Sequence, residues 1–525
     1  MIKATAVRLK PSFVFFAIII VVSIILFHGL GKTPIYILDE ARNAQCAREM
    51  MQRNDWVVPT FNEELRIQKP PLHYYGMIVA YHIFGVNAFA ARFFSALLGI
   101  LLIVITFLFV KKIKGSSVAL LTILILASST HLLFEFRLSV PDPYLIFFFT
   151  LTMLSLYGYL KSEKALPLYL ASVAMALAVL SKGPVALGLA GVPVLVWMTW
   201  EKKLKLIWKP QMLVAALLFV SITLPWYWLV HQKTNGAFTN GFFLEQNLNR
   251  FSQPMEGHGG WFILVPLFVW VGLLPFSSFL MEASKKFKTL FKDSFIKYSV
   301  LIAAWVLIVF SISETKLPNY PMLCYPFIAI WLAQWAYNAY QERQLTKSYP
   351  IIVLIALNFL LAIGLFIALK NEPTLKGYEW WAFIFLAVSI GCFMVLRNYR
   401  QQLFTNALIV LAVLYAIFNF LFLGFTYPLI YQNNPVTKSL PIIEGKKLYA
   451  LGLYNPSFNF HTKEAIPNLT SVDRIDSIWK IEPDALIVSR EKTLANLDST
   501  FSYQVVWLYK DIFENSTTVI LKKPD

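Results

Sequence analysis

The sequence predicts an α-helical polytopic membrane protein. Hydrophobic residues occupy 58% of its 525 positions, whereas Asp, Glu, Lys and Arg together occupy only 14%. The mean hydropathy is +0.60, and apolar runs long enough to cross a bilayer recur along most of the chain. This composition is too apolar for a soluble enzyme, which must keep a polar surface.

The apolar runs give about thirteen predicted transmembrane helices. The first is expected to remain uncleaved: Lys3, Arg8 and Lys10 precede it as in a signal peptide, but no small-x-small cleavage site follows it. The predicted spans are 11–31, 88–110, 117–134, 142–160, 166–181, 184–200, 210–231, 261–281, 298–313, 320–340, 350–369, 379–396 and 403–426.

Lysine and arginine gather in every second connection between these spans. The positive-inside rule places such connections in the cytoplasm, so the formal net charge of +17 reflects topology, and we expect no nucleic-acid partner. The N-terminus is then cytoplasmic, and the remaining connections and the C-terminal tail lie outside, where they could form one site. The basic connections carry Lys3, Arg8 and Lys10; Lys111, Lys112 and Lys114; Lys161 and Lys164; Lys202, Lys203, Lys205 and Lys209; Lys285, Lys286, Lys288, Lys292 and Lys297; Arg343 and Lys347; and Arg397 and Arg400.

The first outer loop, 32–87, is unusually polar for a chain of this composition. Asp39 and Arg42 share one face of a predicted amphipathic helix at 39–55, which would lie along the membrane interface. Lys69 precedes two prolines, which would end one element and start the next helix. Ionisable residues next to a membrane span are functional candidates.

Two further outer loops carry basic residues beside aromatic ones. Arg250 precedes Phe251, with Glu256 and His258 close behind, and Lys316 lies four positions before Tyr320. Three basic centres in three outer loops would suit a phosphate group on a lipid.

An ordered series of short motifs carries a family resemblance. From about 11 to 430 the chain resembles the membrane glycosyltransferases of GT-C architecture, which include the lipid A aminoarabinose transferases and, more distantly, the protein O-mannosyltransferases. The motifs are Asp39, Glu40, Ala41, Arg42; Lys69, Pro70, Pro71; Phe84, Gly85, Val86, Asn87; Ala90, Ala91, Arg92; Lys182, Gly183, Pro184; Pro225, Trp226, Tyr227; Asn247, Arg250, Phe251; Gly257, His258, Gly259, Gly260; and Thr315, Lys316, Leu317, Pro318, Tyr320.

The resemblance implies a reaction and a set of site residues. It implies transfer of a sugar from a polyprenyl (undecaprenyl) phosphate donor to a lipid A-like, glycan or protein acceptor at the outer face of the bacterial inner membrane. Such a displacement needs a carboxylate for the nucleophile and cations for the departing phosphate. Asp39 matches the family's first-loop acid, expected to act as general base or to orient the acceptor, and Asp142 matches the second acid. The implied donor-phosphate contacts are Arg42, Lys69 and Tyr320, with Lys316 and Arg250 as weaker additions.

Each of these residue types also has a purely structural role. An aspartate at the start of a helix is often a cap, which applies to Asp39 and Asp142, and Arg42 could be a snorkelling interfacial residue. Lys69 could belong only to a rigid turn. His258 in its glycine-flanked loop could be structural. Lys182 is interpreted as a helix-end lysine that reaches water, with a substrate contact as the alternative.

One position departs from the family pattern. Where the aminoarabinose transferases carry a glutamate that contributes to a divalent metal site with a histidine, this chain has Gln68. An amide oxygen is a poorer zinc ligand than a carboxylate, so a zinc requirement is not expected. Glu64 or Glu256 could compensate, and His258, Gln68 and Glu256 remain candidates for a metal or substrate contact.

The tail from 431 to 525 is predicted to form a small extracytoplasmic α/β domain after a transmembrane domain at 1–430. Strand-like runs alternate there with two helical segments, and the domain could cover the cavity, contact an acceptor or only stabilise the fold. The strand-like runs are 447–453, 485–489, 503–509 and 517–521, with helices near 472–478 and 491–497.

Two other functional classes remain open. A ligase or polymerase of lipid-linked glycans would bind the same phosphate, and a secondary transporter would be expected to show internal repeats and midplane charges.

Overall fold

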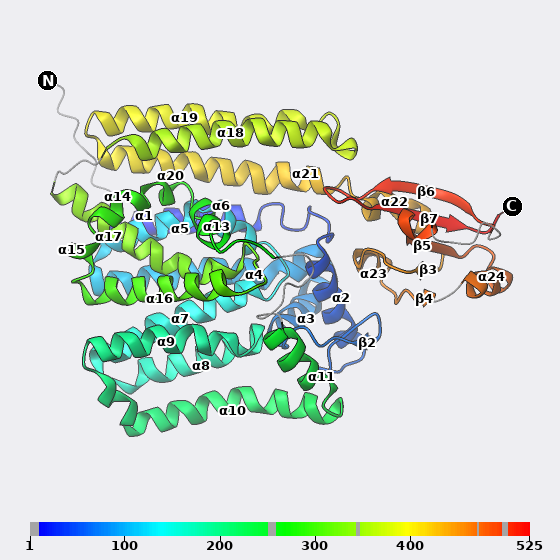
Figure 1. Ribbon diagram of the computed structural model, residues 1–525, viewed down its shortest axis with the longest axis horizontal. Coiled ribbons are helices and arrows are strands. Elements are labelled where there is room, and N and C mark those ends of the chain that lie inside the picture. The colour runs from blue at the N-terminus through cyan, green and yellow to red at the C-terminus, as the bar shows by residue number, and fades with distance from the viewer. Residues whose placement is uncertain (1–9, 250–258, 343–346, 470–471, 496–501, 525) are drawn as a thin grey trace.

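The computed structural model describes residues 10–249, 259–342, 347–469, 472–495 and 502–524. Long helices lie side by side in an elongated bundle, and a small sheet sits at one end of it (Figure 1). The long helices of the bundle are α1 (Pro11–Phe27), α4 (Ala88–Lys114), α5 (Ser116–Ser128), α7 (Asp142–Ser162), α8 (Ala165–Lys182), α9 (Val185–Trp200), α10 (Pro210–Lys233), α16 (Ser294–Ile312), α17 (Tyr325–Gln341), α18 (Tyr349–Asn371), α19 (Phe383–Arg400) and α20 (Phe404–Leu421).

Short helices complete the bundle and its ends. They include α2 (Leu38–Gln52), α3 (Leu72–Phe84), α6 (Thr130–Glu135), α11 (Ala237–Asn240), α13 (Leu264–Gly272), α14 (Leu280–Lys285), α15 (Phe287–Leu290) and α21 (Tyr427–Tyr431). The remaining turns are 3₁₀ helices at Leu204–Trp208, Phe276–Phe279, Tyr320–Cys324, Pro373–Leu375 and Glu379–Ala382, and π-helical turns at Gly241–Asn249 and Phe422–Thr426.

The fold is that of a polytopic helical membrane protein, but a count of thirteen spans is not confirmed. Within the described ranges, eight helices are long and apolar enough to cross a bilayer, or nine if the bent pair 264–272 and 276–285 is one span. That pair bends by 116°, so the predicted continuous helix at 261–281 is wrong. Pro275 lies at the break, and a proline has no backbone N–H to continue a helix. The helices α1, α5 and α9 are apolar but shorter.

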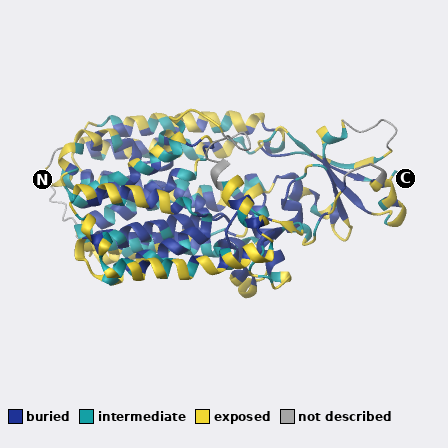
Figure 2. Cartoon of the chain, turned by 60° about the horizontal axis from the view of Figure 1, so that its bottom comes forward, coloured by how far each residue is buried: buried dark blue, intermediate teal, exposed yellow. Residues whose placement is uncertain are grey.

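Helix α7 occupies the centre of the bundle. In its most apolar 18-residue window 78% of the residues are buried, against 22% for α10 and for α18. Figure 2 shows the same gradient, with buried residues through the middle of the bundle and exposed ones along its outer helices. A side chain at the start of α7 is therefore enclosed by neighbouring helices rather than by lipid.

The basic connections meet at one end of the bundle. Lys114, the last residue of α4, pairs with Asp293 before α16, Lys297 lies 2.8 Å from Glu201, and Lys203 lies 3.4 Å from Glu163. The helices α2 and α3 and the C-terminal sheet lie at the opposite end (Figure 1). The basic connections thus lie at one end of the bundle, and the first loop and the C-terminal sheet lie at the other, as the charge pattern predicted.

The tail forms a five-stranded mixed sheet with the order β4-β3-β5-β7-β6. Strand β3 runs parallel to β4 and β5, whereas β7 is antiparallel to β5 and β6, and a small C-terminal α/β unit is confirmed. The exact boundary at 430 and 431 stays a prediction. Its elements are β3 (Leu448–Leu451), β4 (Asn468–Leu469), β5 (Leu486–Arg490), β6 (Gln504–Lys510) and β7 (Thr517–Lys522), with α22 (Pro435–Ile443), α23 (Ser457–Thr462), α24 (Val472–Ile481) and α25 (Glu491–Leu494).

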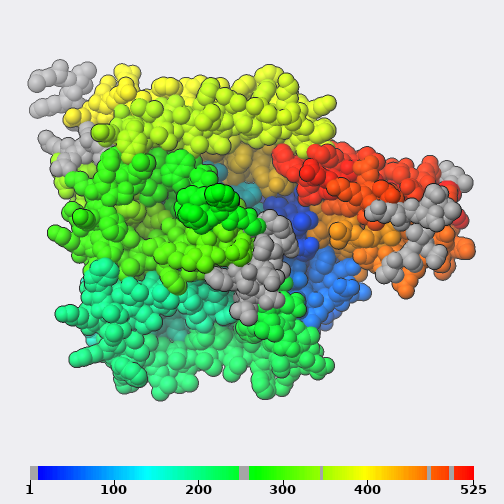
Figure 3. All heavy atoms as spheres, in the orientation of Figure 1, coloured from blue at the N-terminus to red at the C-terminus, as the bar shows by residue number. Residues whose placement is uncertain are grey.

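Helix α2 joins this unit to the bundle. Ten of its fifteen residues are buried, so it is more enclosed than the predicted interfacial helix. The Arg48 guanidinium donates to the backbone oxygens of Phe460 at 2.9 Å and Asn459 at 2.5 Å, and the Ser457 hydroxyl donates to the Ile35 oxygen. Figure 3 shows the C-terminal unit seated against the first-loop segment, beyond the end of the long helices. The first loop also contains the hairpin of β1 (Thr60–Phe61) and β2 (Glu64–Leu65).

Candidate active site

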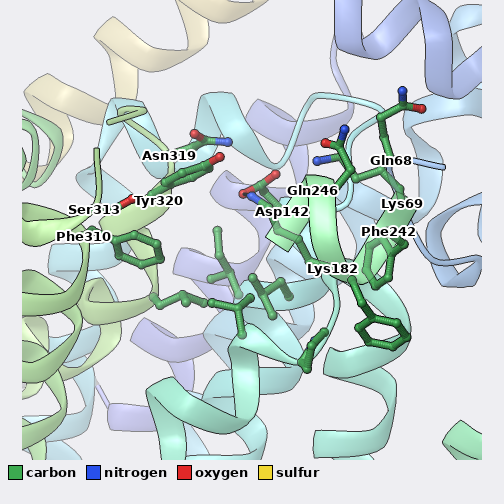
Figure 4. A pocket seen from close by; sticks show the side chains of 16 residues that line it. Gln68, Lys69, Asp142, Lys182, Phe242, Gln246, Phe310, Ser313, Asn319 and Tyr320 are labelled. Carbon is green, nitrogen blue, oxygen red and sulfur yellow. Dashed lines mark hydrogen bonds and ion pairs between the residues drawn. The ribbon is translucent and has the colours of Figure 1, made fainter. Parts of the chain in front are cut away.

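A cavity of about 450 Å³ opens at the end of the bundle that carries the first loop. Figure 4 shows Asn319 and Tyr320 on one wall, Gln68 and Lys69 on the other, and Asp142 between them. Its polar lining residues are Gln68, Lys69, Asp142, Lys182, Gln246, Ser313, Asn319 and Tyr320, and its apolar ones include Leu145, Ile146, Val185, Phe242, Phe243, Phe310 and Leu323. Such a mixture of apolar walls and a few convergent polar groups is typical of a ligand site.

An ion pair lies at the wall of this cavity. Lys182 Nζ is 2.5 Å from Asp142 Oδ1, and the two side chains are only 13% and 8% exposed. Lys182 Nζ also lies 4.6 Å from the centroid of the Tyr320 ring, where an ammonium is attracted by the π face. The interpretation of Lys182 as a helix-end lysine in water is therefore wrong.

The fold, rather than local sequence, forms the pair. Asp142 is the first residue of α7 and Lys182 the last of α8, and these consecutive helices are joined by a short turn. Because they run antiparallel, the start of one lies beside the end of the other. The helix cap before Asp142 is Pro141, and no side-chain capping bond is made there, so a role of Asp142 as the cap is not supported.

A second acid, which the sequence analysis missed, lies beside this pair. Glu135 ends α6 and is 4% exposed. Burial, reinforced by the charge of Asp142, raises the pKa of the Glu135 carboxyl to about 8, although Lys182 and a hydrogen bond from Asn319 act in the opposite direction. Burial and the Asp142 charge thus both favour the protonated form of the Glu135 carboxyl. The signal that could have found it is an acid inside an apolar run.

The Lys-Pro-Pro run brings the first loop to the cavity. Pro71 is the residue before α3, so the two prolines fix the chain where it turns into that helix. Lys69, immediately before them, is buried and lines the cavity beside Gln68.

A buried network on α2 supports the loop that delivers Asp142. The Arg92 guanidinium donates to both oxygens of the Glu40 carboxylate, at 2.8 and 2.7 Å, and to the backbone oxygens of Leu30 and Thr33. Glu40 also accepts from the Ser139 backbone N–H at 2.8 Å. The bidentate pair of Arg92 and Glu40 therefore links α2, α4 and the segment that leads into α7.

Four of the predicted site residues line this one cavity: Gln68, Lys69, Asp142 and Tyr320. Asp39, Arg42 and Lys316 are not among its lining residues. Arg250, Glu256 and His258 lie outside the described residues.

The first-loop acid has a different setting from Asp142. Asp39 is exposed in the first turn of α2, and the residue at the helix cap is Ile37, with no side-chain capping bond. A role of Asp39 as the cap is therefore wrong. The charge of Asp39 favours the ionised form of Arg66. Arg42, three positions after Asp39 in the same helix, is half-buried. Lys316 is buried and donates to the Ser313 backbone oxygen at 2.8 Å.

The described residues do not fit a zinc site. Among them, no group of three or more His, Cys, Asp or Glu side chains lies close enough together to hold a metal ion. Gln68 offers an amide oxygen next to the cationic Lys69, and the possible substitute Glu64 is exposed on β2. No step of the reaction is therefore assigned to a metal.

Known proteins resemble the chain in sequence and in fold. The dolichyl-phosphate-mannose-protein mannosyltransferase family matches residues 12–238. An uncharacterized protein of Aquifex aeolicus (strain VF5) is 30% identical over 332 residues, covering 63% of this chain and 72% of that protein. The undecaprenyl phosphate-alpha-4-amino-4-deoxy-L-arabinose arabinosyl transferase of Shewanella sediminis (strain HAW-EB3) is 28% identical over 322 residues, covering 60% of this chain and 58% of that enzyme.

The crystal structure of ArnT from Cupriavidus metallidurans bound to undecaprenyl phosphate matches with a TM-score of 0.80 and 20% identity, over 98% of this chain and 99% of that one. At this identity the match establishes the fold, and the GT-C architecture is confirmed. The protein is a multi-pass membrane glycosyltransferase. It belongs to the GT-C enzymes of the aminoarabinose transferase and protein O-mannosyltransferase type.

Proposed function

We propose that the protein transfers a sugar from a polyprenyl phosphate donor, of the undecaprenyl phosphate type, to a lipid A-like, glycan or protein acceptor. The observation that carries the proposal is the cavity in which Asp142, Lys182, Lys69 and Tyr320 converge between apolar walls. An apolar wall suits a prenyl chain, and the cations suit its phosphate. The arabinosyl transferases, whose names include undecaprenyl phosphate, support the donor class.

The chemistry assigned to these residues is a displacement at the anomeric carbon. The acceptor attacks that carbon, the bond to the phosphate oxygen breaks, and the polyprenyl phosphate leaves with the bonding electrons. Lys69 stabilises the departing phosphate, with Tyr320 at the opposite wall and Arg42, Lys316 and Arg250 as further phosphate contacts. The proton of the acceptor passes to a carboxylate.

Two carboxylates have different settings for that task. Asp39 is exposed and is proposed to take the proton or to orient the acceptor, whereas Asp142 is held by Lys182 and is proposed to position the reacting groups. The ammonium of Lys182 stabilises the Asp142 charge where few waters can do so.

The proposed location of the reaction is the outer face of a bacterial inner membrane. The basic connections that meet at one end of the bundle would lie in the cytoplasm, which puts the cavity and the C-terminal unit outside. A reporter fused after Asp525 tests this orientation. Activity of a reporter that works only in the cytoplasm would refute it.

Donor consumption tests the role of Asp39. Purified protein given polyprenyl phosphate sugars is expected to consume donor, and Asp39→Asn should abolish consumption while expression persists. Glu63→Gln is the matched control, because Glu63 is an exposed acid of the same outer loop to which no catalytic role is assigned. Full activity of Asp39→Asn would refute the proposed role of Asp39 in taking the proton or orienting the acceptor.

Mass spectrometry of envelope glycolipids, with and without the protein, would identify the sugar and the acceptor. A mass difference on lipid A would favour the lipid acceptor, and a lengthened or ligated glycan would favour the ligase or polymerase alternative. The polar cavity residues gather at one end of the bundle, an arrangement that does not favour a transporter with a midplane site.

A further inference from the structure

A second cavity, of about 550 Å³, lies where the C-terminal unit meets the bundle. Its walls come from separate parts of the chain. Lys32 follows α1, Arg48 lies on α2, Lys438 on α22 and Lys463 directly after α23. It shares no lining residue with the candidate active site.

The lining of this cavity is cationic. It includes Lys32, Arg48, Lys438 and Lys463 and no carboxylate. The three lysines are exposed, and none of them is within ion-pair distance of a carboxylate in the part of the chain that the structure describes. An unneutralised cluster of this kind attracts an anion.

Arg48 is the fixed part of this cluster. It is 2% exposed, and its Nε has no hydrogen-bond partner among the described residues. Its other nitrogens donate to the backbone oxygens of Phe460 and Asn459 and to the Gln45 side chain, which are neutral groups. Burial lowers the pKa of Arg48 to about 10, so the guanidinium stays charged at neutral pH. The Glu49 charge favours the ionised form of Arg48, but no carboxylate among the described residues is paired with it. Such a buried cation is costly, and an anion in the cavity would offset that cost.

The cavity lies at the level where helices leave the apolar layer. Lys32 comes a few residues after the end of α1, Asn87 is the cap of α4, and Gln432 directly follows α21. The apolar parts of α1 and α4 extend away from this end. Polar ends of membrane spans lie in the headgroup region, so the anion that reaches this cavity most readily belongs to a lipid.

We propose that this cavity binds the phosphate of an anionic membrane lipid headgroup. Lysine and arginine near a bilayer attract anionic headgroups, and Arg48 adds a directional donor. The neighbouring cavity of about 840 Å³ is different, because Glu444 and Glu464 line it beside Lys446, Lys447 and Lys463, so carboxylates offset part of its positive charge. Since the cations come from both the bundle and the C-terminal unit, the headgroup holds the two together.

Lipid binding to the full-length protein in detergent tests the proposal. Phosphatidylglycerol is titrated and bound lipid is counted by native mass spectrometry, with phosphatidylcholine as the zwitterionic comparison. The variant Lys32→Gln, Lys438→Gln, Lys463→Gln changes only exposed side chains, so its folding should be retained. Its affinity for phosphatidylglycerol is expected to fall on the order of 100-fold, since each basic residue near an anionic surface contributes about fivefold.

The matched control is Lys376→Gln, Lys446→Gln, Lys480→Gln, which removes the same charge from exposed positions outside the cavity. The control should bind phosphatidylglycerol within about twofold of the unmodified protein. Equal losses in the two triple variants would overturn the site, because they would reflect net charge alone. Inorganic phosphate is added as a competitor. Displacement of the lipid by phosphate at equal concentration would overturn the assignment to a headgroup and indicate a site for free phosphate.

Discussion

Asp142 and Lys182 form an ion pair across forty positions of the chain, with 2.5 Å between Oδ1 and Nζ. The pair joins the start of α7 to the end of α8 at the cavity and places an ammonium over the Tyr320 ring. Neither side chain has much access to water. A change in one partner therefore leaves the other partner's charge poorly solvated.

The variant Lys182→Met is expected to reduce the transfer rate by about 100-fold or more, because it leaves the Asp142 carboxylate without its cation. Lys182→Arg keeps the charge and should retain part of the rate. Steady-state kcat and KM with a polyprenyl phosphate sugar measure the effect. Lys164→Met, in an exposed connection, should behave as the unmodified protein, and an equal rate for both methionine variants would contradict a role for the pair.

Removal of one partner from the buried Glu40 and Arg92 pair is expected to destabilise the protein. Glu40→Gln or Arg92→Leu should cost about 3 to 5 kcal/mol, since each leaves a buried charge or donors without a partner. Reversible unfolding in mixed detergent measures the loss. Glu444→Gln, at an exposed position, is the control. A loss below about 0.5 kcal/mol, typical of surface positions, would contradict the structural role of the pair.

The contribution of Glu135 to the stability of the protein should fall as the pH rises from about 4.5 to about 8. The folded state keeps a proton on Glu135 until about pH 8, whereas the unfolded state releases it near its ordinary value of 4.5, so the folded state binds more protons in this window. The groups that act on Glu135 are Asp142, Lys182, Asn319 and Glu40.

Thermal unfolding in detergent at intervals between pH 5 and 8 tests this dependence on Glu135. The variant Glu135→Gln remains neutral throughout and should show a flatter profile, with its largest relative gain near pH 8. Identical slopes for the variant and the unmodified protein would show that Glu135 is not the group responsible.

Chelation should leave sugar transfer unchanged. Gln68 supplies an amide where a carboxylate would be needed, and the described residues hold no cluster of metal-binding side chains. Transfer is measured after dialysis against EDTA and again after zinc is restored. A loss that zinc reverses would contradict this expectation and would direct attention to Glu256 and His258.

The helices were predictable because length and apolarity alone define a segment that fits a bilayer. Each predicted range contains a helix. Hydropathy does not register breaks within an apolar run, however, and it joined 117–134 across the turn at Ser129 and 261–281 across Pro275. Whether short apolar helices such as α5 cross the membrane also depends on packing, which a window average does not contain.

The candidate site was predictable where a motif carried its residues. Lys69, Asp142 and Tyr320 were identified by the family pattern, and all three line one cavity. Lys182 was misassigned because its partner lies forty positions away, and a lysine at a helix end is ordinarily solvated. Glu135 was missed because its altered pKa arises from burial and from Asp142, and neither is visible in a single sequence.

The contact between Arg48 and the backbone of Phe460 spans 412 positions. During synthesis the first loop is made long before the residues that complete its hydrogen bonds, and the bundle helices from α4 to α20 are made in between. The loop that carries Asp39 and Lys69 must therefore wait, incompletely packed, until the last part of the chain emerges. Maturation of this enzyme is a late event, and a chain released before the sheet is made would be a membrane-inserted but unfinished catalyst.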